Sequence, residues 1–589
     1  MRDADLRTLA LHCHWIATPL RIKRRVITGD TRSHASCPIW YPLDATFVAD
    51  ERRALDNALR PQERATIGIL RVRLRGLLDS AAMQLPGDAR ISGQRVRFAL
   101  DVGDLLGATK AAAACSTDVV QCGLLRGLIR YRAGDVRGAD SLFSAAAARM
   151  TDDARCAWTD VRVLLDADAR PEYSAMSCSA RAEFNARVWM LSDPLYVEPG
   201  NERRAEHVAR QVTALLLSPL GFDGRQHWAA KFGGEAVAET LLRYGWPTQM
   251  YWGGAAADRG HDNWLLAQGA DTAPPYVVRE YSRDRLHTVP TTAALRAPFR
   301  ATPADWRLNA PGNDDEWWPA EHFARDRSRL TSLPPGQSVM LRRATVTRFA
   351  WAGDLDATEL ARPAGTPVSP SLFVSRSLVD MTRASGAQGV IGQPARVETM
   401  LPGGDAFVGI EIPGDASFPA ARTRFGIAVA APLNALGSER ALSDPLLFAP
   451  PADDLVTLDA DLAVRRMLGS TTLSTSRKVG VYWEGYGFTA TDVVELEVRM
   501  DREDRPGVWS RVGGIFGLGR DASGSLAIRW REERGSSRAL QRVEGTVPLQ
   551  MRSIILDLSR LASGTYRLQL SSTIAGAPPA TSTRALVLR

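Results

Sequence analysis

The chain has 589 residues, of which 45% are hydrophobic and 24% are charged. This length is too great for one hydrophobic core, and the ordinary composition argues against long disorder, so we expect about three to five domains. The net charge of +7 comes from signs that are mixed along most of the chain, and no recognisable nucleic-acid-binding module accompanies it, which argues against a nucleic-acid partner.

Residues 1–45 form a basic leader to which we assign no fold. Residues 1–32 hold seven basic residues against three acidic ones. The apolar stretch LALHCHWIATPL precedes the basic RIKRR instead of following it, so the segment does not have the order of a signal peptide. No window of about eighteen uninterrupted apolar residues occurs, and we predict no transmembrane segment.

Residues 46–180 show apolar residues at helical spacing and are predicted to be helical hairpins. The stretch CGLLRGLIRYRAGDVRGADSLFSAAAARM resembles one tetratricopeptide repeat, with Gly127 for close helix approach, a turn at Gly134-Asp135 and packing through Phe143. A weaker copy precedes it, in which Gly103-Asp104 matches that turn. Such repeats present a groove, which predicts a protein partner for this region. The alternative is an ordinary amphipathic hairpin.

The four cysteines of the helical region are spaced as two local pairs. Cys115 ends one helix and Cys122 opens the next, while Cys156 and Cys178 flank a helix and its return. This arrangement favours two disulfides, and the alternative is four separately buried free thiols. Zinc sites usually have C-x-x-C pairs, which are absent, and no base is identifiable for a catalytic cysteine. Two further cysteines in the leader are left unexplained, Cys13 and Cys37.

Residues 181–300 are predicted to form a central mixed module. The order W, DP, PGNER and EH, followed by an apolar stretch ending in YGWP, resembles the GWxTD-domain proteins over about residues 180–255. The literal Gly-Trp-x-Thr-Asp pentapeptide is absent. The resemblance implies helical repeats, this module and β-sandwich segments in an envelope-associated setting, and it implies no particular activity.

The central module also contains the candidate site residues. If the protein is an enzyme, the catalytic candidates are Asp193, Glu206 and His207. Arg203, His207 and Arg210 fall on one helical face, which points to anion binding. The alternative is a solvated helix face held together by Glu/Arg pairs.

We predict neither a metal nor a cofactor. No H-E-x-x-H spacing supports a metal site, and no P-loop or G-x-S-x-G nucleophile motif occurs. A metal site in the central module would have to use the histidines His207, His227 and His261.

After a linker at residues 301–336, the hydrophobic period changes to two. Runs such as SVMLRRATVTRFAW and AFVGIEIP predict an antiparallel β-sandwich at 337–450, and the proline-rich LSDPLLFAPPADD separates it from a second one at 451–589. The predicted fold is therefore multidomain α+β: N-terminal helical hairpin repeats, the central module and two C-terminal sandwiches.

The function that this architecture predicts is a non-enzymatic interaction or scaffold role outside the cytoplasm, with the helical repeats binding a protein. The competing prediction is a hydrolase with its site in the central module. The alternative prediction for the location is the cytoplasm, because the leader has no recognisable signal peptide. The sequence does not indicate an oligomeric state.

Overall fold

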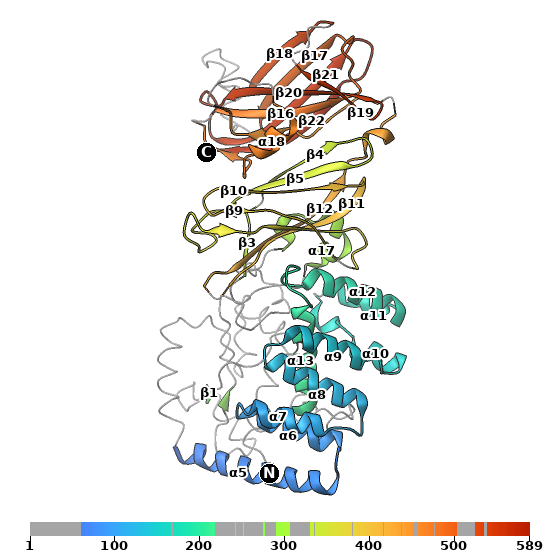
Figure 1. Ribbon diagram of the computed structural model, residues 1–589, viewed down its shortest axis with the longest axis vertical. Coiled ribbons are helices and arrows are strands. Elements are labelled where there is room, and N and C mark those ends of the chain that lie inside the picture. Colours follow the sequence, from blue (N-terminus) through green and yellow to red (C-terminus); the bar gives the residue numbers. More distant parts are fainter. Residues whose placement is uncertain are drawn as a thin grey trace, which may run out of the picture. The chain divides into compact units, whose positions relative to one another are not determined.

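The protein has a mixed α+β fold with helices first and antiparallel-rich sheets after them, as predicted (Figure 1). The structure is a computed structural model. It describes residues 61–165, 169–217, 242, 251–252, 275–276, 290–306, 330–334, 336–379, 381–415, 417–437, 439–451, 458–475, 478–503, 525–534 and 539–589. The leader at 1–45, most of the central module and most of the 301–336 linker lie outside these residues.

The chain divides into two compact units. The first comprises Met1–Pro194, Glu198–Arg296 and Arg307–Ser328, and the second comprises Leu195–Val197, Ala297–Trp306 and Arg329–Arg589. Two short segments of the second unit are therefore flanked in sequence by the first.

The described part of the first unit is mainly helical. No described helix has the length and apolarity needed to cross a bilayer. Its elements are α5 (Pro61–Gln84), α6 (Ala89–Asp101), α7 (Leu105–Ala114), α8 (Val119–Arg132), α9 (Val136–Ala147), α10 (Asp152–Trp158), η3 (Arg162–Leu164), α11 (Ala169–Ala175), α12 (Cys178–Ser192), α13 (Glu202–Leu217) and α17 (Thr292–Arg296), with the short strands β1 (Tyr251–Trp252) and β2 (Pro275–Tyr276).

Helices α6–α7 and α8–α9 form two hairpins with the same turn. Each turn has a glycine with positive φ, Gly103 at +75° and Gly134 at +88°, which is a conformation that favours glycine. The next residue, Asp104 or Asp135, caps the second helix by accepting a hydrogen bond from the backbone N–H three residues on, at 2.7 and 2.8 Å. The predicted match of the two turns is confirmed, whereas the tetratricopeptide assignment stays a prediction.

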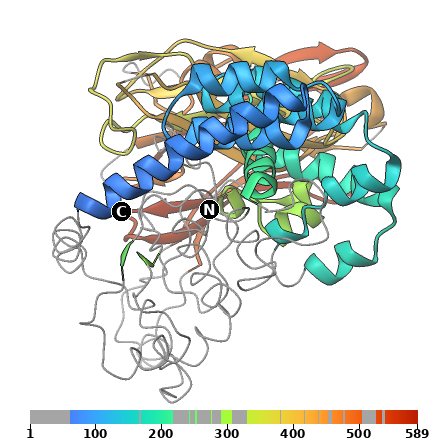
Figure 2. The same cartoon turned by 90° about the horizontal axis from the view of Figure 1, so that it is seen from below.

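Gly127 allows α8 and α9 to pack closely. A Cβ at this position would lie 2.4 Å from Cε1 of Phe143, which is itself buried in the core. Helix α5 packs on α6 and precedes the two hairpins (Figure 2).

Helix α13 packs across α6, α8 and α9. Its apolar residues join the core of the hairpins, and Leu216 accepts a hydrogen bond from Nε2 of Gln94 in α6 at 3.0 Å. This side of the hairpins is therefore covered by the chain's own helix. The α13 residues in the shared core are Ala205, Ala209, Val212 and Leu216.

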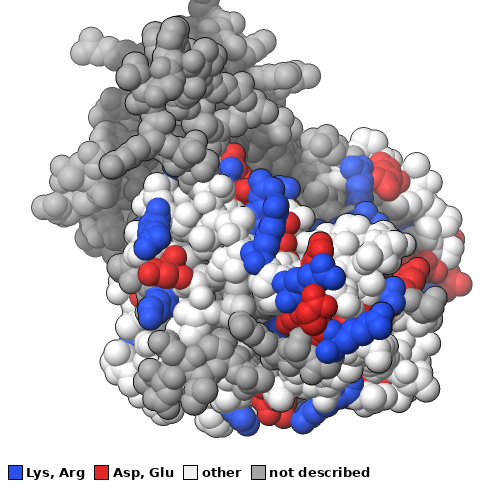
Figure 3. All heavy atoms as spheres, turned by 90° about the horizontal axis from the view of Figure 1, so that it is seen from above, with Lys and Arg blue, Asp and Glu red and all other residues white. Residues whose placement is uncertain are grey.

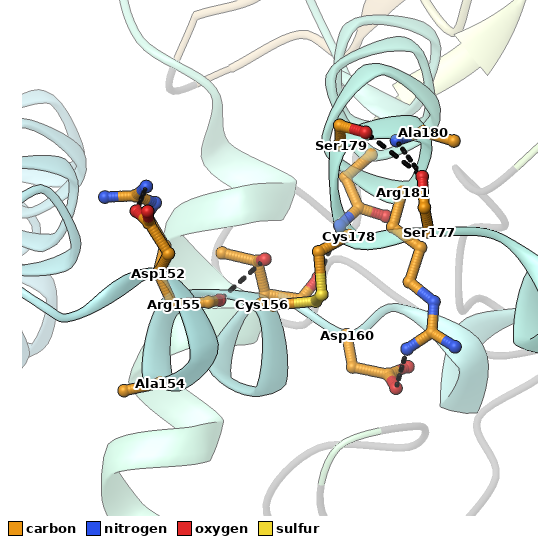
Figure 4. Close-up of a disulfide and its surroundings, with 12 residues drawn as sticks. Asp152, Ala154, Arg155, Cys156, Asp160, Ser177, Cys178, Ser179, Ala180 and Arg181 are labelled. Atoms are coloured by element: carbon orange, nitrogen blue, oxygen red, sulfur yellow. Dashed lines mark hydrogen bonds and ion pairs between the residues drawn. A yellow bond between two sulfur atoms is a disulfide. The ribbon is translucent and has the colours of Figure 1, made fainter.

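Both predicted disulfides are present in the first unit. Cys115 and Cys122 join the end of α7 to α8, with their Cα atoms 5.4 Å apart. Cys156 and Cys178 join α10 to the start of α12, with a Cα separation of 5.6 Å (Figure 4). Near the second bridge, the Ser177 hydroxyl caps α12.

The described part of the second unit contains four larger sheets, which we number I to IV. Sheet I comprises β3 (Leu330–Ser332), β12 (Ala420–Val429), β11 (Gly404–Ile412), β7 (Ser371–Ser375) and β8 (Thr382–Gly386); sheet II comprises β10 (Pro394–Leu401), β5 (Thr347–Asp354) and β4 (Gln337–Arg342). Sheet III comprises β13 (Ala441–Leu442) and β14 (Leu446–Phe448), both paired with β16 (Lys478–Tyr486), then β20 (Val547–Asp557) and β19 (Leu540–Glu544). Sheet IV comprises β15 (Thr472–Leu473), β22 (Ala580–Leu588), β21 (Gly564–Ile574), β17 (Val494–Arg502) and β18 (Leu526–Glu532). Smaller elements are β6 (Pro367–Val368) with β9 (Gly389–Val390), α18 (Ala460–Arg465), η4 (Pro298–Arg300), η5 (Pro303–Trp306) and η6 (Leu433–Ala435).

The four sheets are successive layers with a hydrophobic core between each neighbouring pair (Figure 1). Trp351 of β5 packs between sheets I and II, whereas its neighbour Ala350 packs between sheets II and III. Likewise, Tyr482 of β16 faces sheet II and Trp483 faces sheet IV. Because side chains alternate along a strand, sheets II and III are buried on both faces.

Strands β13 and β14 precede residue 450 but pair with β16, which follows it. Sheet III is thus built from chain on both sides of residue 450, and β14 lies within the proline-rich stretch LSDPLLFAPPADD itself. The two stretches predicted as separate sandwiches, 337–450 and 451–589, belong to one compact unit.

Candidate functional site

Helix α13 has a charged face, and this face is buried. Arg203, Glu206 and Arg210 are each 0% exposed, and His207 is 2% exposed. The four positions follow the i, i+3, i+4, i+7 spacing that places side chains on one side of a helix. The solvated-face interpretation of the sequence is therefore wrong. The apolar residues of α13 join the core of the hairpins, and the charged residues of α13 are buried as well.

Glu206 and Arg210 form an ion pair one helical turn apart. Arg210 also donates a hydrogen bond from Nη1 to the backbone oxygen of Leu242 at 3.0 Å. Removing one partner of a buried pair leaves the other charge uncompensated, which is strongly destabilising. This pair therefore has a structural role whether or not the face binds a ligand.

His207 is held neutral by its surroundings. Burial, and then the positive charges of Arg203 and Arg210, hold the pKa of His207 well below its ordinary value. Its ring lies 5.2 Å from the ring of Trp189, measured between centroids. Neither ring nitrogen has a hydrogen-bond partner in the described part of the chain. A neutral imidazole can offer one donor and one acceptor to a small ligand.

Arg203 remains a cation near neutral pH. Burial, and then Arg210, lower its pKa to about 9, and the opposing influences come from Glu206 and Tyr131. Two buried guanidinium groups next to an uncharged imidazole form an environment that favours a negative group, and the Glu206 carboxylate supplies one in its ion pair with Arg210. The predicted anion-binding candidates, Arg203, His207 and Arg210, are thus neighbours in the structure.

The three catalytic candidates are not linked in the way that an acid–base relay requires. Asp193 follows the end of α12 and is 8% exposed. Burial opposes the charge of Arg204, but the hydrogen bond and charge of Asp140, and then the charge of Asp193, raise the pKa of Arg204. The ring nitrogens of His207 bond to neither Asp193 nor Glu206. A general base normally needs such an orienting partner.

The sequence interpretation missed a bridge from α13 to α9. Arg204 donates two hydrogen bonds to Asp140, from Nε at 2.8 Å and from Nη2 at 2.6 Å. This bidentate geometry fixes the rotation of α13 about its axis. The two residues are more than sixty positions apart, so no local pattern indicates that they pair.

No group of three or more metal-ligating side chains is found among the described residues. His227 and His261, which were considered with His207 as metal ligands, lie outside these residues, as do Cys13 and Cys37. The face of the molecule drawn in Figure 3 carries basic and acidic side chains next to one another, in keeping with the mixed signs of the sequence.

A second buried charged cluster lies between sheets II and III. The carboxylate of Glu484 accepts two hydrogen bonds from the guanidinium of Arg343, at 2.8 and 3.1 Å. It also accepts from the hydroxyls of Tyr482 at 3.0 Å and Tyr486 at 2.8 Å. Burial and the adjacent carboxylate raise the pKa of both tyrosines. With four donors on one carboxylate, this cluster is a structural crosslink between the two sheets.

No family model and no curated protein matches the chain. The resemblance to GWxTD-domain proteins therefore stays a prediction. Among solved structures, red sea bream transglutaminase matches at 7% identity over 44% of this chain and 32% of that chain, with a TM-score of 0.12. Escherichia coli alpha-2-macroglobulin activated by porcine elastase matches at 10% identity over 42% of this chain and 22% of that chain, with a TM-score of 0.13. The chain spans a third or less of either structure, and such TM-scores support no inference about its fold or function.

Proposed function

We propose that the protein is a non-enzymatic scaffold that works outside the cytoplasm and binds a protein partner through its helical region. The observation that carries this proposal is a set of exposed apolar side chains along α5, the helix that precedes the hairpins. Ile69, Val72, Leu77 and Met83 are between 61% and 78% exposed. Exposed apolar patches of this kind commonly mark interaction sites.

The position of α13 decides which side of the helical region is available. Because α13 packs across α6, α8 and α9, that side of the hairpins cannot also hold a partner while α13 is in place. We therefore assign the partner surface to the outer side of α5, and the chemistry that fits it is an apolar protein segment.

The two disulfides support an extracytoplasmic setting, because disulfides persist mainly in oxidising compartments. We also infer that the hairpins are tetratricopeptide-like, that a diverged GWxTD module follows them, and that the four sheets are two sandwiches packed together. Stacked layers joined by buried crosslinks such as Arg343–Glu484 suit a scaffold, since they hold a surface in a fixed shape.

The test is position-specific photo-crosslinking of the full chain in its native cells. A photoreactive residue at Val72 or Leu77 should crosslink to one and the same protein, and a Val72→Glu, Leu77→Glu chain with the probe at Met83 should lose that product. The matched control places the probe at exposed Gln541 of β19. Crosslinks that are equal at α5 and at Gln541, or absent from α5, would reject the proposal.

A hydrolase is the second candidate, favoured by the burial of Glu206 and His207 and by the ring nitrogens of His207 that lack described partners. The full chain should be assayed on ester, amide and glycoside substrates. Turnover that His207→Gln abolishes, and that the exposed control Glu183→Gln leaves intact, would establish this activity. An absence of turnover in the wild-type chain would remove it.

A further inference from the structure

The face of sheet I that points away from sheet II is covered. In β11, Val408 and Ile410 point into the core between sheets I and II, so Phe407 and Glu411 lie on the opposite face. An antiparallel sheet commonly leaves such a face in water. Here Phe407, Glu411 and the neighbouring Arg424 are each 0% exposed.

The centre of this face has a hollow that holds the ring of Tyr196. The register places Gly409 of β11 between Phe373 of β7 and Arg424 of β12. A Cβ on Gly409 would lie 3.2 Å from Cε2 of Tyr196, so the ring sits where a side chain would otherwise be. The Phe373 ring lies 5.9 Å from the Tyr196 ring between centroids, and the Arg424 guanidinium carbon lies 3.9 Å from its centroid. These contacts combine aromatic packing with a cation–π interaction.

One carboxylate links this ring contact to the peptide backbone. Glu411 accepts a hydrogen bond from the backbone N–H of Val197 at 2.9 Å and another from Nη2 of Arg424 at 2.9 Å. Glu411 thus orients the guanidinium over the tyrosine ring and also fixes the residue that follows Tyr196. Hydrogen bonds to a buried charge are stronger than neutral ones.

The segment held in this way is only three residues long. Leu195–Val197 belongs to the second unit, while the residues on both sides of it belong to the first. It does not form a strand of sheet I, and the contacts that join it to the sheet include those of the Tyr196 ring and the Val197 N–H. This is how a short peptide binds to a receptor surface, where one or two anchor residues supply most of the affinity.

A second segment contacts the same face. Trp306 packs edge-on against Phe407, with 5.2 Å between ring centroids. The backbone N–H of Gly426 donates to the oxygen of Ala301 at 2.7 Å. The outer face of sheet I therefore contacts an aromatic side chain from each of two separate segments of the chain.

We propose that the outer face of sheet I is a peptide-binding surface that recognises an aromatic residue followed by a backbone N–H. Its occupant is the chain's own Leu195–Val197. The hollow over Gly409 selects a flat ring, and Arg424 and Phe373 contact that ring. The Glu411 carboxylate accepts a hydrogen bond from the N–H of the next residue. When Tyr196 is absent, the vacant surface accepts an added peptide of the same sequence.

The test uses the full-length Tyr196→Ala protein and a fluorescent peptide with the sequence SDPLYVEPG, residues 192–200. Fluorescence polarisation should show saturable binding at least tenfold tighter than to the wild-type chain, whose surface is filled. The same peptide with its tyrosine replaced by alanine should not bind. Adding Gly409→Val to the Tyr196→Ala protein should abolish binding, because the new side chain occupies the hollow.

A measurement on the unmodified chain covers the case in which Tyr196→Ala does not fold. An excess of SDPLYVEPG should accelerate hydrogen exchange at the Val197 amide by displacing the chain's own segment, and the alanine peptide should not. The proposal would be overturned if the alanine peptide bound as well as SDPLYVEPG, or if binding persisted after Gly409→Val. It would also be overturned if a folded Tyr196→Ala chain did not bind the peptide. Should that variant not fold, unchanged exchange at Val197 in the wild-type chain would overturn it as well.

Discussion

At the scale of single residues, the environment of His207 makes the stability of the protein depend on pH. An ordinary histidine takes up a proton near pH 6.5. In the folded protein, burial and two nearby arginines oppose that proton. The unfolded chain has neither obstacle, so the two states bind protons differently as soon as the solution becomes mildly acidic.

Acidification should therefore destabilise the protein through His207. Below about pH 6.5 the unfolded state is protonated at this residue and the folded state is not, so stability is lost as pH falls and is regained as pH rises, by up to about 1.4 kcal/mol per pH unit. His207→Gln, which cannot titrate, should flatten this slope. Urea unfolding of both proteins between about pH 7 and pH 5 provides the measurement. The other seven histidines are present in both proteins, so parallel curves would contradict the prediction.

The candidate site shows what a residue pattern can and cannot predict. The spacing of Arg203, His207 and Arg210 correctly places them together, because helix geometry alone fixes which residues share a face. The burial of that face was not predictable, since Glu206 and Arg210 form the same pattern on a solvated helix. What encloses them is tertiary structure, such as Trp189 of α12.

At the scale of elements, the hairpin α8–α9 depends on a missing side chain. Glycine in a helix interior is intrinsically unfavourable. Gly127 is retained in a position where the Phe143 ring leaves no room for a methyl group. Local propensity and packing therefore act in opposite directions at this residue, which makes it a sensitive test of the hairpin's geometry.

Gly127→Ala should destabilise the first unit by about 1 to 3 kcal/mol, because the added methyl group overpacks the contact with Phe143. The matched control is Gly76→Ala in α5, where nothing lies within 4 Å of the new Cβ. That change should be neutral or stabilising by up to about 1 kcal/mol, the difference in helix propensity. Denaturant unfolding followed by the helical circular dichroism signal distinguishes the two. Equal effects would show that the α8–α9 contact is looser than described.

Strands were predictable from their alternation, but the partners of their outer faces were not. The run AFVGIEIP places Phe407, Gly409 and Glu411 on one side of β11, which the period of two indicates correctly. Nothing within the run indicates that Val197, more than two hundred residues earlier, bonds to Glu411. Contacts between segments so far apart in sequence have no periodic signal, and pattern analysis assigns such a face to water by default.

At the scale of the whole molecule, both units contain enclosed ion pairs, such as Glu206–Arg210 in the first, but the described disulfides lie in only one unit. Both described disulfides lie in the first unit, and the buried Arg343–Glu484 crosslink lies in the second. Sequence analysis predicted helices followed by sheets. The sequence did not indicate the hydrophobic core between sheets II and III. This core combines strands from 337–450 with strands from 451–589, and the periodicity of one strand does not indicate which other sheet it packs against.

Reduction should weaken the first unit selectively. Each bridge is expected to contribute about 2 to 4 kcal/mol, mainly by restricting the unfolded chain. Pulse proteolysis with peptide identification, with and without reductant, should show faster cleavage within residues 61–217 and unchanged cleavage within 330–589. A Cys156→Ser, Cys178→Ser chain should reproduce part of the effect without reductant. Equal acceleration in both ranges would contradict the prediction.

Glu484→Gln should destabilise the second unit by about 3 kcal/mol, because the largely enclosed Arg343, whose side chain is 17% exposed, then loses its counter-charge. The control is Glu497→Gln, whose partner Arg529 is 71% exposed and whose loss should cost less than about 1 kcal/mol. Denaturant unfolding measures both. We expect the wild-type sheets to unfold in one transition, and separate transitions for sheets I–II and III–IV would refute the crosslink's role.

The covered face of sheet I has a practical consequence for anyone dividing this protein. A fragment that begins at residue 330 would carry all four large sheets, yet it would lack Tyr196, Phe299 and Trp306. It would then present Phe373 and Phe407 to water beside a charged pair that has lost its covering. Such a fragment should aggregate through the exposed aromatic residues. Adding peptides that span 192–200 and 297–306 should cover this face again and reduce the aggregation.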